Sequence, residues 1–172
     1  MQGAGKPRPF LINMTLALGI DPGTATTGYG FVRELPDGSL EMVAYGVIIT
    51  PKELSAPERL DLFYQELNKL LAEYRPETCG VEKLFFQKNI STAILVGQAR
   101  GVALLALAQA GLGIAEYTPN EVKQAVAGYG SADKKQVQEM VRVLLSLPYI
   151  PKPDDAADAL AIAITHLHTR RY

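Results

Sequence analysis

The sequence predicts an α/β protein in which a five-stranded mixed sheet carries helices on both faces. Three strand-like apolar segments come first and are joined by short turns at Pro22-Gly23 and around Gly38, which favours an antiparallel meander. Helical and strand-like segments then alternate to the end of the chain. That order is typical of parallel strands covered by helices, so the sheet is expected to be mixed.

The expected elements follow from periodicity and from start and stop signals. Ser55 with Glu58 forms a capping-box pattern before a helical period, and Pro76 stops that helix. Thr118 and Pro119 begin another helix, and Ser131 is expected to cap the next. Strands are expected at 15–21, 27–34, 40–50, 78–84 and 113–118, and helices at 56–74, 91–111, from 119, from 132 and at 156–168.

The composition is that of an ordinary globular protein. A length of 172 residues with 48% hydrophobic content suits one domain with a sizeable core. The single cysteine, Cys79, lies in an apolar run and is expected to be a small buried residue, which fits a reducing cytoplasm. We expect no membrane span, because Gln98 and Arg100 interrupt the longest apolar stretch at 92–110.

Residues 1–13 precede a second methionine, Met14, and lack the long apolar stretch of a signal peptide. A natural extension, a misassigned start and a remnant of cloning would all explain them. We therefore expect the folded domain to cover 14–172. The formal charge of −1 does not exclude a polyanionic substrate, because two bound divalent ions would raise it to +3.

Four acidic residues lie where ordinary structure does not explain them. Asp21 and Glu82 each end an apolar strand, where a carboxylate is poorly solvated and no helix is available to cap. Asp155 and Asp158 are three residues apart, so they share one face of the last helix. Either Asp154 or Asp155 is expected to cap the start of that helix, and capping explains Asp154 well.

The chemistry of these four residues predicts a divalent-metal site. Carboxylate oxygens without a neighbouring histidine or cysteine favour Mg²⁺ or Mn²⁺ over zinc. Two such ions, bridged by Asp21, would activate water and stabilise the leaving oxygen in phosphodiester hydrolysis. His166 shares this helix face but lies about 12 Å along the axis from Asp158, so we expect it to be structural.

Five segments then resemble a known family in the same order along the chain. They are GIDPGTATTGYG, GVEKLFFQKN, LVGQARGVALLALA, VKQAVAGYGSADKKQVQEMV and DDAADALAIAITH, spanning about 16–168. This pattern resembles a bacterial RuvC-type Holliday-junction resolvase, a crossover junction endodeoxyribonuclease. The resemblance implies an RNase H-like fold, a homodimer that makes symmetric nicks across four-way junction DNA, and dependence on Mg²⁺. It also implies a cytoplasmic role in recombination and repair with the RuvA and RuvB branch-migration proteins.

The resemblance also implies roles for individual residues. The catalytic acids, which are also the metal ligands, fall on Asp21, Glu82, Asp155 and Asp158. The functional lysines fall on Lys123 and Lys134, on either side of a Gly-Tyr-Gly link, and the base-stacking aromatic falls on Phe85. Lys83 departs from the glutamine familiar at its position, which leaves that contact open.

The residues that follow Glu82 also predict a DNA contact, independently of the resemblance. Phe85 and Phe86 precede a polar stretch that contains Lys88 and Asn89, so at least one aromatic ring is expected to be exposed for stacking on a base. A place in the core is the alternative for either ring. The helix 91–111 is apolar on nearly every side, which predicts burial all round and a part in the dimer interface.

Two other functions share some of these features. The GIDPGT hairpin resembles the phosphate-binding hairpin of actin-like and sugar-kinase-like ATPases, but 172 residues leave no room for their second lobe. A junction-binding relative without catalysis is the other, and the presence of all four acids argues against it. Turnover of ATP would support the first, and binding of a junction without cleavage would support the second.

Overall fold

A computed structural model describes residues 14–83 and 89–170. Its sheet has the strand order β3-β2-β1-β4-β5, in which β1 pairs antiparallel with β2 and parallel with β4. The elements are β1 Thr15–Asp21, β2 Thr26–Glu34, β3 Leu40–Ile49, α1 Ala56–Tyr74, β4 Thr78–Glu82, α2 Ile90–Gln109, β5 Gly113–Tyr117, α3 Pro119–Ala127, α4 Lys134–Leu144 and α5 Asp154–Thr169. The expected mixed sheet is confirmed, including the meander and the placement of β4 beside β1.

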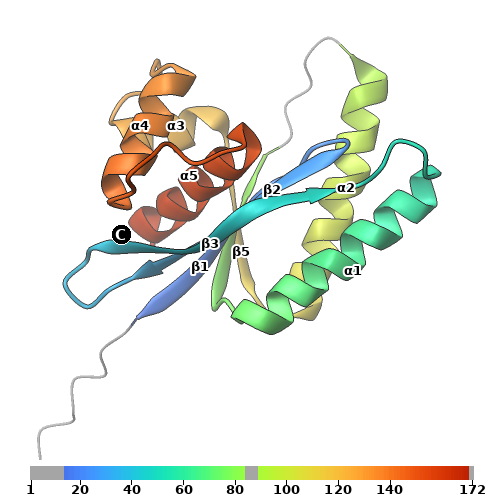
Figure 1. Cartoon of the computed structure of the whole chain (residues 1–172), viewed down its shortest axis with the longest axis horizontal. Helices are drawn as coiled ribbons and strands as arrows, with labels where there is room; N and C mark the ends of the chain where they lie inside the picture. The colour runs from blue at the N-terminus through green and yellow to red at the C-terminus, as the bar shows by residue number, and fades with distance from the viewer. Residues whose placement is uncertain (1–13, 84–88, 171–172) are drawn as a thin grey trace, which may run out of the picture.

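Helices cover both faces of the sheet (Figure 1). One apolar layer joins the sheet to α1 and α2 and includes Phe31, Phe63 and Leu107. The other joins it to α3, α4 and α5 and includes Val141 and Leu160. Helix α5 crosses the middle strands and is almost wholly buried, because alanine and isoleucine fill its length. Cys79 is buried, as its apolar setting predicts.

Three predicted helix starts are wrong by one to two residues. Asp133, not Ser131, caps α4, because its carboxylate accepts from the Gln136 backbone N–H at 2.9 Å while Gln136 bonds back in a capping box. Helix α2 begins at Ile90 and not at residue 91, and the Asn89 side chain caps it by accepting from Thr92 N. Pro153 occupies the cap position of α5, so neither Asp154 nor Asp155 caps that helix.

Helix α2 is the single helix among the described residues that is long and apolar enough to cross a membrane by length and composition alone. The sequence leads us to expect no membrane span, although α2 passes this test in spite of Gln98 and Arg100. One helix of this kind is weak evidence, since a helix in a protein core passes the same test. Arg100 in α2 donates to the Glu82 carbonyl oxygen at 3.3 Å and pairs with Glu116, which are contacts of a helix packed on a sheet.

Candidate active site

Asp21 and Glu82 come together because they end two parallel neighbours in the sheet. Ile20 of β1 pairs with Val81 of β4, so the next residue on each strand emerges at the same edge. Both strands are buried up to that point, and both carboxyl groups are partly buried. Arg100 fixes the end of β4 by bonding the Glu82 carbonyl. The pairing of β1 with β4 therefore places the carboxylates of Asp21 and Glu82 side by side at one edge of the sheet.

Two glycines let α5 approach this point. A Cβ atom on Gly28 would overlap the carbonyl oxygen of Asp155, and one on Gly19 would overlap that of Ala159. Gly28 is also the strand partner of Asp21. The absence of a side chain at these positions allows the helix backbone to rest directly on the sheet. This contact brings the first turn of α5 to the end of β1.

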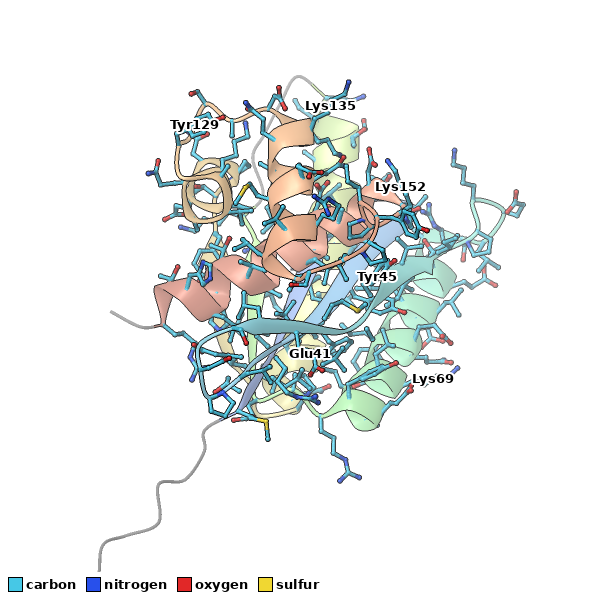
Figure 2. The ribbon with its side chains drawn as sticks, turned by 60° about the vertical axis from the view of Figure 1, so that its left-hand side comes forward. Glu41, Tyr45, Lys69, Tyr129, Lys135 and Lys152 are labelled. Carbon is cyan, nitrogen blue, oxygen red and sulfur yellow. The ribbon has the colours of Figure 1, made fainter. Side chains whose placement is uncertain are left out.

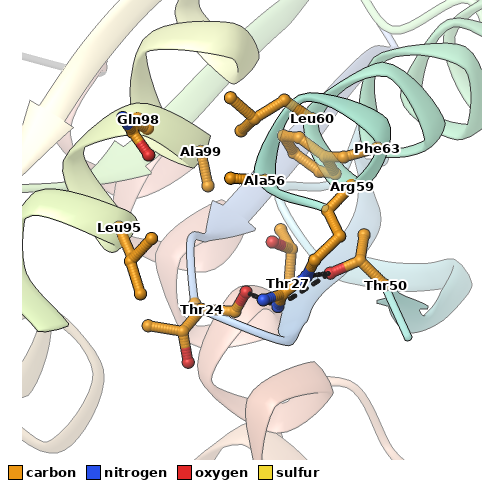
Figure 3. A pocket seen from close by; sticks show the side chains of 11 residues that line it. Thr24, Thr27, Thr50, Ala56, Arg59, Leu60, Phe63, Leu95, Gln98 and Ala99 are labelled. Carbon is orange, nitrogen blue, oxygen red and sulfur yellow. Dashed lines mark hydrogen bonds between the residues drawn. The ribbon is translucent and has the colours of Figure 1, made fainter. Parts of the chain in front are cut away.

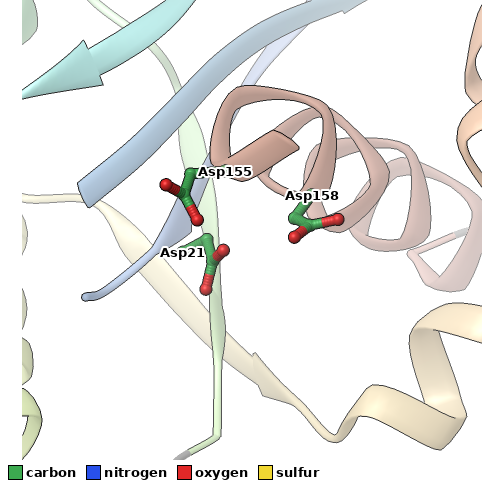
Figure 4. Close-up of side chains that lie close together, drawn as sticks. All are labelled: Asp21, Asp155 and Asp158. Carbon is green, nitrogen blue, oxygen red and sulfur yellow. The ribbon is translucent and has the colours of Figure 1, made fainter. Parts of the chain in front are cut away.

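The result is a compact acidic cluster formed by Asp21, Asp155 and Asp158 (Figure 4). One carboxylate oxygen from each lies within 4.8 Å of the others. The Glu82 carboxyl group reaches Asp21 closely enough to share a hydrogen bond. Hard oxygen donors that are partly buried and mutually repulsive fit Mg²⁺ or Mn²⁺. The residues present therefore suit a divalent metal ion.

The raised pKa values of the clustered carboxyl groups show that nearby positive charge would stabilise their ionised forms. Burial, followed by the charges of Glu82 and Asp158, raises the pKa of Asp21 to about 9. Burial also raises the pKa of Glu82 and of Asp158. Without a metal ion, Asp21 therefore holds a proton at neutral pH and shares it with Glu82. A bound cation would replace that proton.

Two predicted lysines lie beside the acids. Lys134 Nζ is 3.1 Å from Asp158 Oδ2, and this bond and charge raise the pKa of Lys134 although burial alone would lower it. Lys123 and Lys134 line an open pocket of about 200 Å³ whose wall also includes Glu82 and Asp158. Positive and negative groups thus share one hollow, which suits a phosphate bound against metal ions.

The hairpin that follows Asp21 is tied down from the opposite face of the sheet (Figure 3). The Arg59 guanidinium donates to the Thr24 carbonyl and, from Nε at 3.2 Å, to Thr50 Oγ1. Thr50 N in turn donates to the Ala25 carbonyl at 2.9 Å. These bonds join the hairpin, the end of β3 and the start of α1, and so they fix the backbone that carries Asp21.

His166 has the structural role expected for it. Its ring is buried, with Nε2 at 2.5 Å from Thr78 Oγ1 and Nδ1 at 2.8 Å from the Tyr117 hydroxyl. Burial, and then the charge of Arg170, lowers its pKa to about 4. The imidazole is therefore neutral at physiological pH and holds α5 against β4 and β5.

The remaining predicted residues divide into two groups. Phe85, Phe86 and Lys88 lie outside the described residues. Asn89 is exposed and uses its side-chain oxygen to cap α2, a function that we did not expect, and a DNA contact there stays a prediction. Gly28 and Arg59 are the supporting residues missed by inspection of the sequence. A glycine inside a strand was the available signal for Gly28.

The strand order, together with carboxylates at the ends of two central strands and on the helix packed across them, defines a nuclease of the RNase H-like class. The family model described as crossover junction endodeoxyribonuclease RuvC matches residues 17–166, so the chain belongs to that family. The nuclease function and the fold expected from the sequence are thereby confirmed, and the ATPase alternative is not favoured.

Individual relatives agree with this assignment. The crossover junction endodeoxyribonuclease RuvC of Chloroflexus aurantiacus is 60% identical over 153 residues, which cover 89% of this chain and 93% of the relative. The structure of Thermus thermophilus RuvC superposes with a TM-score of 0.85 at 38% identity, covering 91% of this chain and 96% of that one. The same protein in complex with a Holliday junction substrate gives a TM-score of 0.84 at 35% identity, with the same coverage.

Proposed function

We propose that the chain resolves four-way DNA junctions by hydrolysing one phosphodiester bond per active site, with Asp21, Glu82, Asp155 and Asp158 as the catalytic, metal-binding acids. The observation that carries this proposal is the close approach of three partly buried carboxylates, one at the end of β1 and two at the start of α5. Membership in the RuvC family and the junction complex of the Thermus thermophilus relative support the substrate.

Mg²⁺, as two ions per site with Mn²⁺ as a substitute, would supply an activated water and stabilise charge on the leaving oxygen. Asp21 interacts with Glu82, Asp155 and Asp158, so it would be the acid shared by two ions. Lys123 and Lys134 would hold DNA phosphates in the pocket beside the acids. Their contacts are to the backbone, so they would give affinity that falls with salt and carries no sequence preference.

A homodimer would supply the second active site for a paired cut. Ile94 and Leu105 are exposed on α2, at 55% and 53%, and Gly101 between them has open space around its Cα. This apolar face, continuous with the rest of α2, supports a symmetric interface. Leu104 is partly buried against the core, so Leu105 is the better residue with which to disrupt a dimer.

The other expected properties rest on the resemblance. Phe85, Phe86, Lys88 and Asn89 would contact the junction, and RuvA and RuvB would be partners in the pathway. Action on junction DNA and a free buried cysteine support a cytoplasmic location. Residues 14–172 would form the nuclease domain, with 1–13 as an extension.

The test is structure-selective cleavage. Purified protein is incubated with Mg²⁺ and either a synthetic four-way junction or linear duplexes made from the same strands. We expect paired nicks at symmetry-related positions of the junction, at a rate at least tenfold above that on the duplexes. Equal cleavage of both substrates would contradict a junction-resolving function, and binding without cleavage would favour a non-catalytic relative.

A further inference from the structure

Lys134 is held by two acids that differ in their surroundings. Its Nζ is 3.1 Å from Asp158 Oδ2, inside the acidic cluster, and 3.6 Å from Asp154 Oδ2, outside it. Lys134 is the first residue of α4, where positive charge opposes the helix dipole. The stability of α4 therefore does not explain this lysine, and its two acidic partners do.

Asp154 lies in the first turn of α5, where its charge favours the helix dipole, but it does not cap the helix. It makes no capping hydrogen bond there, and its Oδ1 atom instead accepts from Lys152 Nζ at 3.0 Å. Gln138 is buried and lies beside this carboxylate, and its Nε2 atom has no well-formed hydrogen bond among the described residues. Three donor groups therefore surround a carboxylate that lies next to the cluster but is not a member of it.

The lysine Lys152 belongs to the loop that enters α5. It projects from the side of the molecule formed by α4 and the start of α5, as does Lys135 (Figure 2). Lys152 and Lys134 take different oxygens of Asp154, so both lysines can bind it together. Asp154 is thus shared between a lysine at the pocket and a lysine in the loop.

Asp158 cannot serve Lys134 and a divalent cation equally well. An ammonium group at 3.1 Å from Asp158 would lie close to a cation bound by the same carboxylate, and like charges at such separations repel. If Lys134 Nζ moves toward Asp154, its distance from the cation increases, and the ammonium group keeps a carboxylate partner. The two carboxylates lie four residues apart on α5, so the ammonium need only shift along one helix face.

We propose that Asp154 is a positioning residue for Lys134. When a divalent cation occupies Asp158, the Asp154 carboxylate accepts the Lys134 ammonium group and keeps this group at the rim of the pocket, where it can bind a DNA phosphate. This inference rests on the proposed function. Lys152 binds the other oxygen of Asp154. It therefore weakens the Lys134–Asp154 ion pair enough for a DNA phosphate to compete for Lys134.

The test is a double-mutant cycle read by direct Mn²⁺ binding, measured by titration calorimetry on DNA-free protein. The proteins are the wild type, Asp154→Asn, Lys134→Met and the double variant. In the wild-type background, Asp154→Asn is expected to weaken Mn²⁺ binding about threefold, the scale of an exposed ion pair, because Lys134 is left with Asp158 alone. In the Lys134→Met background the same substitution is expected to change the affinity by less than about 1.5-fold.

The double-mutant cycle distinguishes positioning of Lys134 by Asp154 from the direct effect of the Asp154 charge on the cation. An equal weakening in both backgrounds would mean that Asp154 acts only through its own field and would overturn the proposal, as would no weakening in either. Asp61→Asn removes an exposed acid on α1, across the sheet, and serves as the charge-matched control that leaves binding unchanged. Failure of the wild type to bind Mn²⁺ would instead contradict the proposed metal site, so the two failures are distinguishable.

Discussion

Gly28 lies directly against the main chain of Asp155 and is at the same time the strand partner of Asp21. One residue without a side chain therefore sets the distance between two acids that are 134 positions apart in the sequence. The acidic cluster depends on this backbone contact as much as on the carboxylates themselves.

Substitution of Gly28 by alanine tests that dependence. A Cβ atom would push α5 away from β2 and displace Asp155, and a misplacement of about 1 Å can reduce catalysis about 100-fold. We expect junction cleavage to fall by that order while the protein loses about 1–3 kcal/mol of unfolding free energy, as overpacking does. Urea unfolding and single-turnover cleavage measure the two effects.

Gly113→Ala is the matched control. Its Cβ would meet only Thr78 Oγ1, at 3.9 Å, so an ordinary contact forms and cleavage is expected to stay within about twofold of the wild type. Full activity of Gly28→Ala would show that α5 tolerates displacement, and the packing argument would then be wrong.

Metal-free protein is expected to gain stability when Asp21 becomes asparagine. The pKa of Asp21 is raised to about 9, so its contribution to stability is present below its ordinary value of 3.8 and is lost as pH rises through about 9. At pH 8, Asp21→Asn removes part of this loss, and a gain of about 1–2 kcal/mol would raise Tm by about 3–6 °C. The difference is expected to shrink near pH 4.

Added Mg²⁺ is expected to reverse the order of the Tm values of the wild type and Asp21→Asn. It is expected to raise the Tm of the wild type, because it binds the folded acids, and to leave the variant nearly unchanged. Thermal melts at pH 8 and pH 4, with and without Mg²⁺, measure both effects. A metal-free variant that melts at or below the wild-type temperature at pH 8 would contradict the electrostatic account.

The proposed dimer is tested on α2. Leu105→Lys places a charge on the exposed apolar face without entering the core, so the fold is expected to survive and the dimer to dissociate at least tenfold more readily. Sedimentation at micromolar concentrations reports the change. Lys69→Leu, at an exposed position on α1, controls for altered surface charge. A dimer that sediments unchanged would place the interface elsewhere.

The sequence predicted the sheet and its acids because each signal was local. Asp21 and Glu82 interrupt apolar strands, and the Asp155–Asp158 spacing places both carboxylates on one helix face. The start of α5 was mispredicted because Pro153 takes the cap position, which frees Asp154 for Lys134 and Lys152. The contact with Lys134 joins segments that are distant in the sequence, and no local pattern predicts it. Arg59 was missed for the same reason, since Thr24 and Thr50 are brought to it only by the folded meander.

The central claim is that Asp21 and its partners hold the metal ions that cleave DNA. The most direct measurement is the single-turnover cleavage rate of a four-way junction, compared between the wild type and Asp21→Asn across a Mg²⁺ titration. The account predicts Mg²⁺-dependent paired nicks by the wild type and a loss of at least 1,000-fold in the variant, equivalent to about 4 kcal/mol of transition-state stabilisation. Cleavage by Asp21→Asn at the wild-type rate, or cleavage without any divalent ion, would contradict it.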